Sequence, residues 1–98
     1  MAQKLKTAEQ MARHFKGMAN HYRISIMLIV DADDKITVED ITDRLNANFK
    51  TISQHTRYLT QTGLIRKQYK GRTVAHSLSP YGKIFIKFTK EFQRTNFI

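Results

Sequence analysis

The chain has 98 residues, a formal net charge of +9 and no cysteine. This length predicts one compact domain over residues 1–98, and the absence of cysteine excludes disulfides and thiolate metal sites. The excess of positive charge predicts a polyanionic partner, for which nucleic acid is the first candidate and an anionic membrane surface the second.

Two helices are predicted in the first third of the chain. Thr7 and Gln10 have the spacing of a capping box, and apolar residues follow at helical intervals, so we expect a helix at about 7–18. Asn20 is the candidate cap of a helix at about 21–31, which is apolar on most sides and is therefore expected at the centre of the core. We expect residues 31–34 to form a loop. The apolar run of the second helix is too short to span a bilayer. The first residues of the chain are polar, so we expect no signal peptide.

Two further helices are predicted around a short turn. Thr37 is the candidate cap of a helix at about 38–46, whose apolar positions are expected to face inward (Val38, Ile41, Leu45). Residues 46–48 read as a turn, and Asn48 as the cap of a helix at about 49–62 that ends at Gly63. Ile52 and Leu59 mark the buried side of this last helix.

A β-hairpin and a final helix complete the chain. The hairpin is predicted at about 64–78, with Lys70 and Gly71 as its turn and alternate residues of its second strand pointing inward (Val74, His76, Leu78). Ser79 and Pro80 predict the start of a helix at about 80–95. This helix carries an apolar stripe (Tyr81, Ile84, Phe85, Phe88, Phe92) that could be a ligand pocket or a partner groove, although the core of a dimer is the simpler reading.

The resulting fold class is mainly α with a small β-hairpin wing, which is the winged helix-turn-helix architecture. In that architecture the second helix of the pair presents its first turns to the major groove of duplex DNA, and the hairpin reaches the backbone or the minor groove. The charges agree with this use, because residues 44–98 carry eleven Lys or Arg and one acid, whereas residues 1–43 carry six Lys or Arg and seven acids. We expect base and phosphate contacts from polar side chains of the second helix and of the hairpin (Asn48, Lys50, Thr51, Ser53, Gln54, Arg57, Lys67, Lys70, Arg72).

Residues 15–78, approximately, resemble the ArsR-like winged-helix transcriptional regulators. The resemblance rests on five segments taken together (Met18–Ile24, Ile41–Asn48, Thr51–His55, Leu59–Ile65, and Gly71–Val74 with Leu78). It implies a homodimer built from the first and last helices, a regulator that is usually a repressor, and base-reading roles for Lys50, Ser53 and Gln54. The matching partners are double-stranded DNA and a second copy of the chain, in the cytoplasm.

The chain also departs from that family's pattern. The positions of its usual metal ligands hold no thiolate in residues 37–41 and no His, Asp or Cys in residues 80–98. We therefore expect no metal and no cofactor, and the identity of a small-molecule effector stays open. Thr56 stands where the family usually has a core leucine, so either Thr56 faces inward or the helix is slightly rotated.

The histidines and the function class leave alternatives. His14 and His21 could share a metal site, but such residues are more often structural. His55 could contact DNA or face the domain. His76 is expected to pack under the wing. No constellation of nucleophile, base and acid is visible, so we expect no enzyme. The alternative to a sequence-specific DNA regulator is a winged-helix module that binds protein or RNA, for which Phe49 is the one supporting residue.

Overall fold

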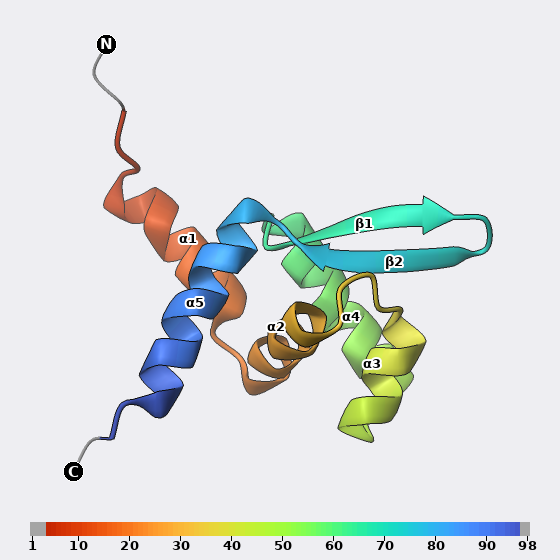
Figure 1. Cartoon of the computed structure of the whole chain (residues 1–98). Coiled ribbons are helices and arrows are strands. Elements are labelled where there is room, and N and C mark those ends of the chain that lie inside the picture. The colour runs from red at the N-terminus through yellow and green to blue at the C-terminus, as the bar shows by residue number, and fades with distance from the viewer. Residues whose placement is uncertain (1–3, 97–98) are drawn as a thin grey trace.

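A computed structural model of the chain describes residues 4–96, so residues 1–3 and 97–98 of the predicted domain lie outside the described part. Five helices and one antiparallel hairpin follow each other in the predicted order, which confirms the predicted fold class (Figure 1). Their bounds are α1 Ala8–Met18, α2 His21–Ala32, α3 Val38–Leu45, α4 Phe49–Gln61, β1 Ile65–Lys70, β2 Thr73–Leu78 and α5 Pro80–Arg94.

Each helix begins where the sequence places a capping side chain. The hydroxyl of Thr7 accepts from the backbone N–H of Gln10, whose own side chain accepts from the N–H of Thr7, so the capping box is present. The side chains of Asn20, Thr37, Asn48 and Ser79 likewise accept from first-turn N–H groups of α2, α3, α4 and α5. These caps satisfy donors that a helix start leaves without an intrahelical partner.

Two local predictions are wrong by one or two residues. Asp31 and Ala32 belong to α2 and not to the following loop, because the N–H of Asp33 still bonds the carbonyl of Ile29. The hairpin turn consists of Gly71 and Arg72, since Lys70 pairs with Thr73. Gly71 has a φ of +61°, the left-handed value that a two-residue turn of type II′ requires at its first position.

One hydrophobic core takes residues from every helix and from both strands. Helix α2 lies at its centre, as predicted, with Ile26, Met27 and Val30 buried. Helix α5 closes the core through Ile86 and through Gly82, where an added Cβ would lie 2.2 Å from the carbonyl oxygen of Leu64. A glycine at this position therefore lets the start of α5 rest directly on the backbone that leads into the hairpin.

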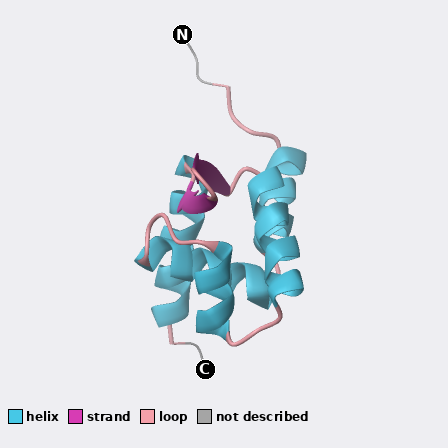
Figure 2. Ribbon diagram, turned by 90° about the vertical axis from the view of Figure 1, so that its right-hand side faces the viewer, coloured by secondary structure: helices cyan, strands magenta, loops and turns pink. Residues whose placement is uncertain are grey.

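The wing and the two terminal helices lie at opposite ends of the molecule. In Figure 1 the hairpin extends away from α1 and α5, and Figure 2 shows it end on. The base of the hairpin is held by a bridge between Ile36 and His76, in which the N–H of His76 donates to the carbonyl of Ile36 at 2.9 Å. None of the helices described is long and apolar enough to cross a membrane.

Candidate nucleic-acid interface

Helix α4 presents one polar face outward. Ile52 and Leu59 are fully buried, and Lys50, Gln54 and Arg57 are exposed at intervals of three and four residues, which places them on one side of the helix. Thr51 and Ser53 are half-buried. The structure therefore presents the predicted donors of this helix together, within its first three turns.

Asn48 has a structural role in addition to its predicted contact. Its side-chain oxygen accepts from the N–H of Thr51 at 3.2 Å, so it caps α4. Its amide N–H groups remain free to donate to a ligand. Asn48 can thus donate to a phosphate at the helix start without leaving its cap.

The cations of this surface are free of carboxylate partners. Within residues 4–96 the structure has two ion pairs, Arg44 with Asp33 and Lys90 with Asp31. The five basic residues predicted to meet DNA form none (Lys50, Arg57, Lys67, Lys70, Arg72), and all are exposed. Their charge is available to a phosphate backbone without the loss of an existing pair.

The hairpin separates two of the predicted contacts. Lys67 lies opposite His76 in the strand register and shares the inward face of the hairpin with Ile65, whereas Lys70 lies opposite Thr73 on the other face. The predicted cluster of Lys67, Lys70 and Arg72 at the hairpin tip is therefore divided. Positions 67 and 70 are three apart on one strand, so strand alternation alone predicts their separation.

A groove of about 230 Å³ runs between α4 and the wing. We call it the wing groove, and its walls include Ser53 and Arg57 from α4 and Lys67 and Arg72 from the hairpin. Four of the nine predicted contact residues therefore meet there, whereas Asn48, Lys50, Thr51, Gln54 and Lys70 lie outside its walls. Guanidinium and ammonium groups on two sides suit a phosphate group between them.

Sequence reasoning missed several residues of the wing groove. Tyr69, 71 % exposed, lines it from β1, and Glu39 of α3 supplies its one carboxylate among the described residues. The alternation of β1 places Tyr69 on the same face as Lys67, which would have identified it. Phe49, on which the predicted alternative of protein or RNA binding rests, is 52 % exposed and also lines the groove.

Thr56 and His76 form the floor of the wing groove. Both are 2 % exposed, so Thr56 does face inward, and its hydroxyl has no hydrogen-bond partner. Nδ1 of His76 lies 3.1 Å from the carbonyl oxygen of Ile36, which can only accept, so this nitrogen carries the proton. Burial lowers the pKa of His76, and the ring is therefore neutral near pH 7 with Nε2 as an acceptor. His76 packs under the wing, as predicted.

His55 packs against the domain, which resolves the two alternatives for it. Its ring stacks on Tyr22 with centroids 5.4 Å apart, and its Nδ1 lies 3.4 Å from a guanidinium nitrogen of Arg23. Burial, then the charge of Arg23 and then that of His21 lower the pKa of His55. The ring is thus a neutral spacer between α2 and α4.

The apolar stripe of α5 points outward. Phe88 is 62 % exposed, Ile84 66 %, and Phe15 of α1 59 %, whereas Phe85 is half-buried and packs edge-on against Phe15. A groove of about 220 Å³ with mainly apolar walls lies between α1 and α5 beside these residues. An apolar surface of this kind on a small protein indicates an interface.

The structure separates the two histidines considered for a metal. His14 contacts the rings of Tyr81 and Phe85, whereas His21 contacts Tyr22. In the part of the chain that the structure describes, no group of three or more His, Asp or Glu residues could hold a metal ion.

Known proteins similar to this chain include a protein described as a transcriptional activator. No protein-family model matches the chain. The transcriptional activator HlyU of Vibrio cholerae is 31 % identical over 64 residues, a match that covers 65 % of this chain and 58 % of that protein. The chain therefore spans less than two thirds of the length of the curated relative it matches.

Solved structures share the fold over most of the chain. HlyU of Vibrio cholerae superposes with a TM-score of 0.80 at 26 % identity, covering 91 % of this chain and 97 % of that one. The repressor PagR of Bacillus anthracis gives 0.75 at 23 % identity, covering 83 % and 93 %. A homodimeric winged helix-turn-helix DNA-binding domain from Mycobacterium bovis, described as a possible ArsR-family regulator, gives 0.77 at 21 % identity, covering 95 % and 90 %. The last two show the fold alone.

Proposed function

We propose, from the confirmed resemblance of this chain to the ArsR-like winged helix-turn-helix regulators, that it is a homodimeric regulator of transcription which binds specific duplex DNA in the cytoplasm. One observation carries the proposal. The exposed polar face of α4 and the wing groove together hold basic side chains that have no acidic partner in the described part of the chain.

Different residues have different tasks in this proposal. Gln54 can form two hydrogen bonds to an adenine, and Lys50 can donate to a guanine or a phosphate. Arg57, Lys67 and Arg72 hold the backbone from the two sides of the wing groove, and these contacts supply affinity through release of counterions. Base choice thus rests on α4, and affinity rests mainly on the groove.

The second copy completes the DNA-binding unit. We propose that the outward apolar residues of α1 and α5 pair across a twofold axis, over residues 7–18 and 80–96. The homodimeric Mycobacterium domain of the same fold supports this arrangement. Two α4 helices would then enter successive major grooves about 34 Å apart on a pseudo-palindromic site. Phe88→Asp should give a monomer in sedimentation with its helical content retained, and a variant that stays dimeric would contradict this interface.

Selection of bound duplexes from a random pool at two salt concentrations tests the DNA-binding proposal. We expect a palindromic consensus. If all five cations of each protomer meet phosphates, the salt slope of the dimer approaches about −9. Gln54→Ala should relax choice at one base pair by about 1–3 kcal/mol, and Arg72→Ala should weaken all sequences alike and lower the slope by about 1 per protomer.

Gln54→Ala and Arg72→Ala also distinguish the proposed DNA-binding regulator from the alternative, a winged-helix module that binds protein or RNA. The exposed aromatic residues Phe49 and Tyr69 at the wing groove are the observation that favours binding of protein or RNA. If single-stranded RNA competes as well as the selected duplex, or if neither Gln54→Ala nor Arg72→Ala changes duplex binding, the DNA proposal fails. HlyU is named an activator and PagR a repressor, and we propose repression, which a promoter–reporter assay measures directly.

A further inference from the structure

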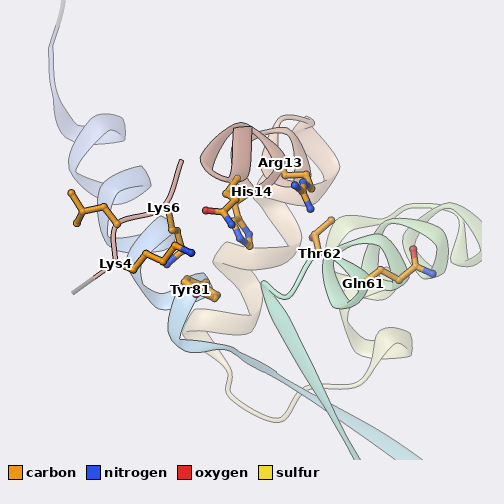
Figure 3. A pocket seen from close by; sticks show the side chains of 9 residues that line it. Lys4, Lys6, Arg13, His14, Gln61, Thr62 and Tyr81 are labelled. Carbon is orange, nitrogen blue, oxygen red and sulfur yellow. The ribbon is translucent and has the colours of Figure 1, made fainter. Parts of the chain in front are cut away.

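A second basic hollow lies where the N-terminal segment, α1, the end of α4 and the start of α5 meet. Its volume is about 580 Å³. Lys4, Lys6 and Arg13 line it, and none of its lining residues is acidic. We call it the basic cleft, and Figure 3 shows these side chains around it together with His14 and Tyr81.

The basic cleft exists because α1 approaches the end of α4 closely. An added Cβ at Gly17 would lie 3.0 Å from the hydroxyl oxygen of Thr62, so a larger residue would hold the helices apart. Arg13 lies one turn before Gly17 on the same side of α1 and is thereby brought beside Gln61 and Thr62.

Its walls offer hydrogen-bond donors. The side-chain oxygen of Gln10 is occupied by the N–H of Thr7, which leaves its amide N–H groups free to donate into the cleft. Nδ1 of His14 is buried and has no partner. The ammonium of Lys6 lies over the ring of Tyr81, 4.6 Å from its centroid, a cation–π contact that orients it.

We propose that the basic cleft binds a small polyanion of metabolite size, carrying phosphate or carboxylate groups. Three cations without an acidic partner in the described chain meet at a concave surface. Gln61 also lies eleven residues beyond Lys50, about 16 Å along the axis of α4, so the cleft is remote from the first turns of that helix.

A ligand in the basic cleft would touch three functional parts at once. It would contact α1 and α5, which carry the proposed dimer face, and α4, which carries the proposed base contacts. Binding there can therefore couple to DNA affinity, and the coupling would be reciprocal. This regulatory role rests on the proposed function, whereas the binding of the anion does not.

Titration of the full chain with pyrophosphate, and separately with citrate, tests the site at constant ionic strength. We expect saturable amide shifts at Arg13, Gln61, Thr62 and Tyr81 in NMR spectra without DNA. Binding of one probe alone assigns phosphate or carboxylate chemistry, and binding of both supports the shared site. One opposite charge at about 4 Å contributes about 1 kcal/mol in water. Arg13→Gln should therefore lower the affinity of the cleft for the probe about fivefold.

Lys16→Gln is the matched control, because Lys16 is an exposed cation of the same helix outside the cleft. It should leave the affinity of the probe nearly unchanged. Equal loss in the two variants, shifts spread over the whole surface, or no shifts would overturn the proposal. If neither probe binds while Arg13→Gln weakens duplex binding as much as Arg57→Gln does, the cleft is a DNA contact, which also overturns it. Failure of duplex binding in every variant, with saturable anion binding intact, would refute only the proposed function.

Discussion

Replacement of Gly82 by alanine should destabilise the protein, although alanine favours a helix interior by about 1 kcal/mol over glycine. The new Cβ would lie 2.2 Å from the carbonyl oxygen of Leu64. Because Cβ atoms essentially never approach another atom closer than 3.0 Å, the start of α5 and the backbone at Leu64 must separate by about 0.8 Å. The obstacle is backbone, which cannot rotate away as a side chain can.

The size of the effect follows from the contacts at this joint. The carbonyl of Leu64 accepts from the N–H of Ser79 at 3.1 Å, and the hydroxyl of Ser79 accepts from the N–H of Gly82 at 3.0 Å. Overpacking contributes a loss of about 1–3 kcal/mol, and a weakened hydrogen bond about 1 more. After the gain in helix propensity, a net loss of about 1–3 kcal/mol remains.

Urea unfolding followed by circular dichroism, at one fixed protein concentration, measures this loss. Lys83→Ala, at an exposed neighbouring position of α5, reports the helix propensity alone and should change little. Gly17→Ala meets only side-chain atoms of Thr62, at 3.0–3.3 Å, and should cost less than Gly82→Ala. A Gly82→Ala protein as stable as the wild type would refute the reasoning.

Three other changes have defined directions. The pKa of both His55 and His76 is lowered from 6.5. At and below that pH the unfolded chain therefore binds more protons than the folded chain. The free energy of unfolding should be constant above about pH 7 and fall as the pH drops through 6.5. His55→Gln should flatten this fall in denaturant titrations at several pH values, and an unchanged slope would contradict its assignment as a half-buried neutral ring. Thr56→Val removes a buried hydroxyl without a partner and should raise stability by about 1 kcal/mol; a loss in thermal unfolding would show that the hydroxyl is satisfied. Asn46 caps α3 with a φ of +48°, so Asn46→Ala should lower stability by about 1 kcal/mol while Asn46→Gly does not, and equal effects in the same assay would contradict the backbone explanation.

Local chemistry explains why the fold could be predicted so closely. Thr7, Asn20, Thr37, Asn48 and Ser79 cap their helices through bonds within three residues, and such bonds depend on nothing distant in the chain. The hairpin turn is less accurately predicted, because distant groups decide it. The bridge from Ile36 to His76 and the pairing of Ile65 with Leu78 set the register of the hairpin, and neither is visible in the sequence.

The candidate site divides in the same way. The outward face of α4 follows from helical periodicity, so Lys50, Gln54 and Arg57 could be chosen from the sequence alone. The meeting of Arg57 with Lys67 across the wing groove could not, since it depends on how the hairpin packs against α4. The apolar stripe of α5 follows from the sequence pattern, whereas Ile86, the residue of α5 that enters the core, lies outside the predicted stripe.

The hairpin is anchored at one end only. The backbone of His76 is tied to Lys35 and Ile36, while Gln68 to Thr73 are all exposed. The root of such a strand pair is held by the domain, whereas its exposed tip opens at a lower free energy than the core. In the proposed complex with DNA, the tip would follow the varying width of a minor groove from one site to the next, while α4 keeps its register on the bases. Hydrogen exchange should record this gradient, with slow amides at Ile36 and His76 and fast amides at the turn.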